Sequence, residues 1–106
     1  MKYLIIGSKG QLGKEFVQKF NELGEKYICA DRDELDITSL DAVNNFFDKY
    51  KPRIVINCSA YNLVDKAETD SFDAFNVNSI GVYNLAIASK NINAYLVHYS
   101  SDYVFD

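Results

Sequence analysis

The sequence has few of the residues that mark several specialised classes of protein. Its 106 residues include two cysteines, one proline, one histidine and no tryptophan. Two cysteines cannot build the disulfide framework of a small secreted domain, and one histidine cannot supply a metal site of histidine ligands. We therefore expect Cys29 and Cys58, which lie in apolar runs, to be buried free thiols in the reducing cytoplasm, and we expect no bound metal.

Long apolar segments and an excess of positive charge are also absent. No run approaches the ~18 apolar residues of a membrane helix, and the run after Met1 is too short for a signal peptide. Eleven basic residues stand against 15 acidic ones, and the net charge of −4 does not favour nucleic-acid binding. The remaining composition, 48% hydrophobic and 25% charged, is typical of one globular domain without a membrane or nucleic-acid partner.

Apolar patterning predicts strands that alternate with helices. Short continuous apolar runs, typical of strands buried on both faces, fall at 3–6, 27–30, 53–57 and 95–99. Helical periodicity predicts helices over 11–23, 40–50 and about 71–90. We expect Gly24 to end the first helix, and Thr38 with Asp41 to form a capping box for the second. Such alternation indicates a parallel α/β sheet with helices on both faces.

The last helix and strand carry three further expectations. One stripe of the helix is expected to face the sheet: Phe72, Phe75, Ser79, Val82, Leu85, Ala86 and Ser89. We expect His98 to be a strand residue packed beneath a helix. The strand Tyr95–Tyr99 would form an exposed apolar edge, and such edges favour strand pairing, so self-association through it is expected.

A glycine-rich loop follows the first strand and opens the first helix. Gly7, Gly10 and Gly13 form the pattern G-x-x-G-x-x-G, and glycine permits the tight turn and close backbone approach that a dinucleotide pyrophosphate requires. Asp31 ends the second strand, as suits a carboxylate that binds the adenosine ribose. Arg32 could meet a 2′-phosphate, so both NADPH and NADH stay open. A structural turn beside an incidental aspartate is the alternative.

Four more segments carry a family resemblance. They are residues 31–38, 53–61, 64–68 and 98–106. Together with the glycine loop they resemble the dTDP-4-dehydrorhamnose reductases, which are extended short-chain dehydrogenase/reductases. The resemblance spans essentially the whole chain and implies a Rossmann-like parallel sheet in strand order 2-1-3-4. It implies a cytoplasmic NAD(P)H-dependent oxidoreductase of dTDP-rhamnose biosynthesis that reduces a 4-keto sugar nucleotide, dTDP-4-dehydrorhamnose, to dTDP-L-rhamnose.

The resemblance also implies roles for individual residues. The cofactor-binding residues would be Gly7, Lys9, Gly10, Gln11, Leu12, Gly13, Asp31, Arg32, Asp36, Ile37, Cys58, Ser59, Ala60, Tyr61 and Asn78. Ser101 matches the family's catalytic Ser/Thr, and Asp102 and Tyr103 would contact the substrate. Cys58, Ser59 and Ser101 stand where family members often carry Ala, Ala and Thr, which are small changes.

One departure from the family pattern is large. No tyrosine is followed by a lysine four residues later, whereas the family uses such a pair to protonate the substrate carbonyl. We therefore expect residues 1–106 to be the N-terminal portion of an NAD(P)-binding Rossmann domain, truncated after the fourth strand and inactive alone, with the remaining strands and the substrate region absent. The alternative is a non-catalytic nucleotide-binding or regulatory subunit, since the family also resembles the regulatory subunit of methionine adenosyltransferase. Ser101 and Asp102 favour the enzyme.

Overall fold

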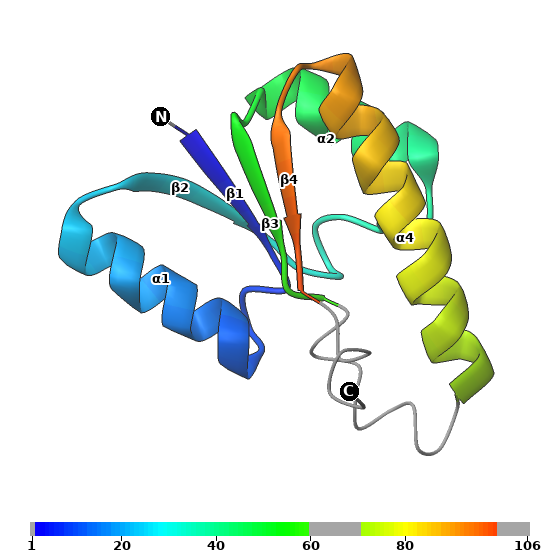
Figure 1. Ribbon diagram of the computed structural model, residues 1–106, viewed down its shortest axis with the longest axis horizontal. Coiled ribbons are helices and arrows are strands. Elements are labelled where there is room, and N and C mark those ends of the chain that lie inside the picture. The colour runs from blue at the N-terminus through cyan, green and yellow to red at the C-terminus, as the bar shows by residue number, and fades with distance from the viewer. Residues whose placement is uncertain (1, 60–70, 100–106) are drawn as a thin grey trace.

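A four-stranded parallel sheet forms the centre of the molecule (Figure 1). The computed structural model describes residues 2–59 and 71–99, with the backbone alone for residues 71–78. The elements are β1 (Lys2–Ile6), α1 (Gln11–Leu23), β2 (Lys26–Ala30), α2 (Leu40–Tyr50), β3 (Ile54–Asn57), α4 (Ser71–Asn91) and β4 (Tyr95–His98). The strand order is β2-β1-β3-β4 and every pair is parallel, so the predicted fold class and strand order are confirmed.

Helix ends are fixed by local chemistry, and one predicted cap is wrong. As predicted, Gly24 ends α1 in the left-handed region with φ 72°, where glycine has no steric penalty. The cap of α2 is Ser39, whose side chain accepts a hydrogen bond from the Ala42 N–H. Thr38 does not cap this helix, because its hydroxyl and its N–H both donate to Asp36 Oδ1.

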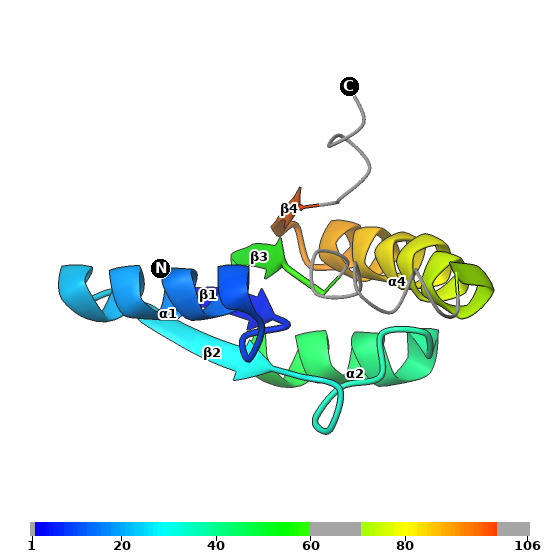
Figure 2. The same ribbon diagram turned by 90° about the horizontal axis from the view of Figure 1, so that it is seen from below.

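The helices cover the two sheet faces unequally (Figure 2): α1 lies on one side, and α2 and α4 lie on the other. Alternate residues of each strand point to opposite faces. The face under α2 and α4 buries a largely aliphatic cluster that comprises Leu4, Ile6, Ala30, Leu35, Ile37, Val43, Phe47, Val55, Leu85 and Ala88. The face under α1 buries Ile5, Phe20, Ile56 and Cys58, with Tyr3, Phe16 and Tyr27 partly buried around them.

The predicted inner stripe of α4 is partly wrong. Ser79 and Ala86 are exposed. The buried positions are Gly81, Asn84, Leu85, Ala88 and Ser89. This stripe can include a polar residue because Asn84 Nδ2 donates to the Ile37 carbonyl over 2.9 Å. It includes a glycine because α4 comes so close to Ile37 that a Cβ on Gly81 would lie 2.5 Å from Ile37 Cδ1.

Two further predictions are wrong, and both concern residues on the outer strands. Cys58 is buried as expected, but Cys29 is exposed, since it lies on β2, which has only one neighbouring strand in the described part of the chain. His98 lies on β4, which is also an edge strand among those described, and its side chain is exposed.

The expected exposed apolar edge is present, with Tyr95 72% and Val97 39% exposed. Of the helices in residues 2–59 and 71–99, none is both long and apolar enough to cross a membrane.

Candidate functional site

The carboxyl ends of all four strands meet at one edge of the sheet (Figure 1). Parallel pairing places the residues that follow each strand there, and ligands of open α/β sheets bind at this edge. The glycine loop follows β1, Asp31 follows β2, Cys58 and Ser59 follow β3, and Tyr99 follows β4. Segments that are far apart in the sequence therefore line one edge.

The glycine loop makes a tight turn between β1 and α1. Gly7 has φ 81°, a left-handed conformation that glycine adopts without strain. The Gly7 N–H donates to the Ala30 carbonyl over 3.0 Å, and the Gly10 N–H donates to the Gly7 carbonyl over 3.3 Å. The loop is thus bonded both to itself and to the end of β2.

Gly13 allows α1 to rest directly on this loop. A Cβ at position 13 would lie 2.2 Å from the Gly7 oxygen and 2.6 Å from the Ser8 Cα. Both of these atoms belong to the backbone, so neither can rotate out of the way. No residue with a side chain fits at position 13 without moving the first turn of α1 away from the sheet.

The N-terminus of α1 has the character of an anion-binding site. No side chain caps it, and Gly10 is extended, with φ −78° and ψ 175°. The first intrahelical bond to Gly10 comes from the Lys14 N–H, so the preceding N–H groups have no partner within the helix. These donors and the positive end of the helix dipole favour a phosphate-like group.

Asp31 is bonded to the glycine loop. Its Oδ2 accepts a hydrogen bond from the Ser8 hydroxyl over 2.5 Å, and its Oδ1 accepts one from the Lys9 N–H over 3.0 Å. Each carboxylate oxygen keeps capacity for a further donor. The sequence reasoning overlooked Ser8, although a small hydroxyl residue directly after the first glycine was a signal for such a contact. Arg32, next to Asp31, is exposed.

The segment after Asp31 is held by protein contacts of its own. Hydrogen bonds from the Thr38 hydroxyl, at 2.6 Å, and the Thr38 N–H, at 3.0 Å, hold the pKa of Asp36 below its ordinary value. The Ile37 side chain is only 7% exposed and packs in the aliphatic cluster. The contact of Asp36 and Ile37 with adenine stays a prediction.

A second polar cluster ties the end of β3 to the end of β4. Asn57 is fully buried, its Oδ1 accepts from the Ser59 N–H and hydroxyl, and its Nδ2 lies 3.0 Å from His98 Nδ1. Burial raises the pKa of the neighbouring Cys58 thiol to about 11, which keeps it a neutral packing group. The sequence reasoning did not assign Asn57 to the site; a polar residue that closes a buried strand was the available signal.

The structure brings together one group of the predicted residues. Gly7, Lys9, Gly10, Gln11, Leu12, Gly13, Asp31, Cys58 and Ser59 lie in or beside the segments that follow the strands. Ala60, Tyr61, Ser101, Asp102 and Tyr103 lie outside the described residues, and Asn78 is described only as a backbone position on α4. Within residues 2–59 and 71–99 no cluster of three His, Cys, Asp or Glu side chains could hold a metal ion.

Comparison with known proteins shows that the chain is similar to dTDP-4-dehydrorhamnose reductases. It is 42% identical over 106 residues to a dTDP-4-dehydrorhamnose reductase of Aggregatibacter actinomycetemcomitans. The aligned region covers 99% of this chain and 36% of that protein. It is similar to the solved dTDP-4-dehydrorhamnose reductase of Clostridium acetobutylicum, with 43% identity and a TM-score of 0.81 over 91% of this chain and 34% of that one. The enzyme from Bacillus anthracis, solved in complex with NADP, gives 36% identity and a TM-score of 0.78 over 90% and 34%.

These matches cover nearly all of this chain but only part of each relative. The chain spans about a third of the length of the relatives that it matches. The family model described as "RmlD substrate binding domain" nevertheless matches residues 1–106, which is every residue of the chain. The resemblance inferred from the sequence motifs is thereby confirmed, and the chain belongs to the RmlD substrate-binding-domain family.

Proposed function

We propose that this chain forms the dinucleotide-binding part of an NAD(P)H-dependent reductase of a 4-keto sugar nucleotide, which converts dTDP-4-dehydrorhamnose to dTDP-L-rhamnose. The observation that carries the proposal is the uncapped start of α1, seated on the loop through Gly13 and flanked by Asp31. The names of the similar proteins, and the NADP in one of their structures, support the same function.

The residues present fit such a cofactor. The N–H groups at the start of α1 would bind the pyrophosphate, because no side chain caps them. Asp31, already oriented by Ser8 and Lys9, would accept hydrogen bonds from the adenosine ribose, and Asp36 and Ile37 would line the adenine. When bound, the reduced dinucleotide supplies the hydride for the keto carbon. Exposed Lys9 and Arg32 would attract a 2′-phosphate, so the site suits NADPH as well as NADH.

The remaining roles follow the family resemblance. Cys58, Ser59, Ala60 and Tyr61 would line the cofactor after β3, and Asn78 would lie near its nicotinamide half. Ser101 would polarise the substrate carbonyl, beside Asp102 and Tyr103. The Tyr-x-x-x-Lys pair that would protonate the carbonyl oxygen does not occur in residues 1–106, so we expect this chain by itself to bind cofactor without turnover.

A titration calorimeter tests the cofactor site. We expect the chain to bind NADPH or NADH weakly, and Gly13→Ala to abolish binding because its Cβ displaces α1 from the loop. Gly24→Ala is the matched control: a Cβ there meets nothing within 4 Å, so the substitution strains only the far end of α1 and leaves binding intact. The absence of a heat signal with either cofactor at about millimolar concentration would contradict the proposed site.

Reductase activity tests the rest of the proposal. The full-length protein should oxidise NADPH or NADH when dTDP-4-dehydrorhamnose is added. Cofactor binding without any turnover would favour the second candidate, a non-catalytic nucleotide-binding or regulatory subunit.

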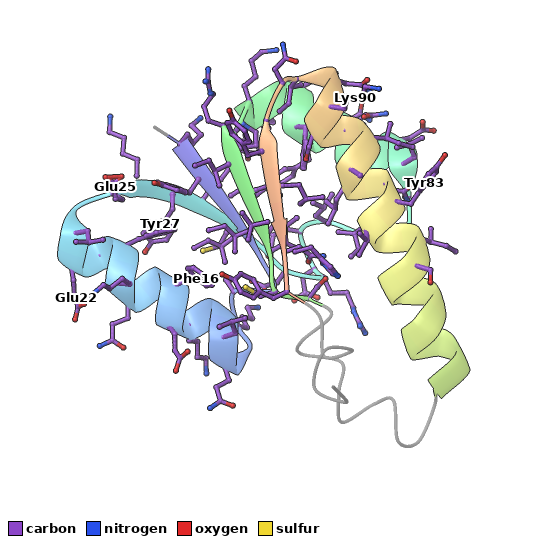
Figure 3. The ribbon with its side chains drawn as sticks, viewed as in Figure 1. Phe16, Glu22, Glu25, Tyr27, Tyr83 and Lys90 are labelled. Carbon is purple, nitrogen blue, oxygen red and sulfur yellow. The ribbon has the colours of Figure 1, made fainter. Side chains whose placement is uncertain are left out.

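We also propose that copies of the chain associate through the β4 edge, in the cytoplasm and without a nucleic-acid or membrane partner. Tyr95 and Val97 are exposed on that strand, and an unpaired apolar edge favours pairing. Sedimentation should detect an association that Val97→Lys weakens. Tyr83→Lys is the control, because Tyr83 is 67% exposed but projects from α4 away from the strands (Figure 3). Equal association of both variants would contradict the β4 interface.

A further inference from the structure

The buried amide of Asn57 joins two strand ends at the candidate site. Asn57 stands in one register row with Ile6 of β1 and His98 of β4. Its buried neighbours on this face in β1 and β3, Leu4, Ile6 and Val55, are apolar. A fully buried polar side chain in this row destabilises the fold unless its hydrogen bonds are made.

Every polar group of the Asn57 amide has a partner. Oδ1 accepts from the Ser59 N–H over 3.1 Å and from the Ser59 hydroxyl over 2.6 Å. Nδ2 lies 3.0 Å from His98 Nδ1. The Asn57 carbonyl also accepts from the Tyr99 N–H over 3.0 Å. One residue therefore bonds both to the segment that follows β3 and to the segment that ends β4.

The direction of these bonds determines which ring nitrogen of His98 carries the proton. A main-chain N–H can only donate, so the amide atom that faces Ser59 is the oxygen, and the NH₂ group faces His98. Because that group donates, Nδ1 must accept. The neutral His98 imidazole therefore carries its proton on Nε2.

We infer that Asn57 is a positioning residue, whose amide locks Ser59 to His98 and so holds the edge of the sheet along which the proposed cofactor lies. The effect on cofactor rests on the proposed function, since Ser59 is one of the residues proposed to line it. The lock itself is a property of the free chain, and the two parts are tested separately.

Nuclear magnetic resonance tests the lock without cofactor. The chain has one histidine, so long-range proton–nitrogen correlations of a ¹⁵N-labelled sample report His98 alone. At about pH 8, where imidazole is neutral, we expect the proton on Nε2. In Asn57→Asp the group facing Nδ1 becomes an acceptor, so the proton should move to Nδ1. Asn84→Ala, which removes another buried amide, one that donates to the Ile37 carbonyl, should leave the Nε2 proton in place.

Kinetics of the full-length protein test the consequence for cofactor. Asn57→Ala should raise the KM for NADPH about tenfold, the equivalent of one lost hydrogen bond, with kcat within about twofold. Asn57→Asp keeps the acceptor for Ser59, so its KM should stay within about threefold of the wild-type value. If Asn57→Ala does not fold, a KM for Asn57→Asp that rises well beyond this limit overturns the positioning role, because this variant keeps the acceptor for Ser59.

The failures are distinguishable. A wild-type proton on Nδ1, or an unchanged tautomer in Asn57→Asp, overturns the lock. Equal KM values for wild type and Asn57→Ala overturn the positioning role while leaving the proposed function in place. A wild-type protein without reductase activity overturns the proposed function, and the tautomer of the free chain still decides whether the lock exists.

Discussion

The two faces of the sheet are built in different ways. Under α2 and α4, the buried side chains are mostly aliphatic, and Phe47 is the largest fully buried side chain among them. Under α1, ring contacts dominate: Tyr3 and Phe20 lie 4.4 Å apart between centroids, and Phe16 lies 6.0 Å from Phe20 and 5.6 Å from Tyr99. Figure 3 shows Phe16 and Tyr27 in the space between α1 and the strands.

The difference follows from the number of helices. Of the helices that the structure describes, two close one face over small, branched side chains, whereas the one on the other face needs large rings to reach across it. Even so, α1 leaves part of its face open, and Tyr95 and Val97 of β4 are exposed there. The helix that begins at the glycine loop thus covers its face less completely. We infer that the α2/α4 face carries most of the stability.

A pair of phenylalanine substitutions gives the largest test of this comparison. Phe47→Ala should lower the free energy of unfolding by about 3–5 kcal/mol, because it empties a fully buried position. Phe16→Ala removes a partly buried ring from the other face and should cost about 1–2 kcal/mol. Urea denaturation followed by circular dichroism measures both. Equal losses, or a larger loss for Phe16→Ala, would contradict the unequal division of stability.

A double-mutant cycle tests how closely the α2/α4 face is packed. Gly81→Ala would place its Cβ 2.5 Å from Ile37 Cδ1, and it should destabilise the chain by about 1–2 kcal/mol despite alanine's better helix propensity. In an Ile37→Ala background the clash is gone, so Gly81→Ala should become stabilising by up to about 1 kcal/mol. Additive effects in the cycle would mean that α4 does not approach Ile37 as described.

The alkylation rates of the two cysteines test how well α1 shields its face of the sheet from solvent. Cys29 pairs in register with Ile5 and therefore shares the α1 face with Cys58, yet Cys29 is exposed and Cys58 is buried. Iodoacetamide at about pH 8 should label Cys29 first, because the reactive species is an accessible thiolate. Mass spectrometry of the digested chain locates the label. Rapid labelling of Cys58 in the folded chain would refute its burial.

The Cys58 thiol also predicts a trend of stability with pH. Burial raises its pKa from 9.0 to about 11, so the unfolded chain ionises first. This contribution to stability is complete below pH 9 and is lost as the pH rises towards about 11. Cys58→Ala should remove this part of the alkaline destabilisation in urea titrations, and Cys29→Ala should not.

Local patterns in the sequence predicted the parts of this molecule that depend on short-range chemistry. Continuous apolar runs marked all four strands, and the glycines at 7, 10 and 13 marked the turn and the start of α1. The parallel sheet followed from the alternation of elements and the right-handed crossover rule, and the strand order followed from the family resemblance. The same reasoning identified Asp31, because an acidic residue at the end of the second strand occupies a fixed place in such folds.

Contacts between distant residues account for what the sequence did not predict. The Ser8–Asp31 bond joins residues 23 positions apart, and the Asn57–His98 contact joins residues 41 positions apart. The orientation of α4 depends on the close approach of Gly81 to Ile37, so helical periodicity alone selected some wrong residues. Ser39 replaced Thr38 as the cap of α2 because Asp36 engages the Thr38 hydroxyl, a competition that spacing does not reveal.

The central place of β1 has a consequence for synthesis on the ribosome. Tyr3 of β1 pairs with Ile54 of β3, about 50 residues later in the chain. At roughly 5–20 residues per second, translation takes several seconds to supply that partner. During this interval the apolar strand Leu4–Ile5–Ile6, fully or almost fully buried in the folded chain, has one side of its backbone unpaired. Nascent β1 is therefore the segment that we expect a ribosome-associated chaperone to bind first.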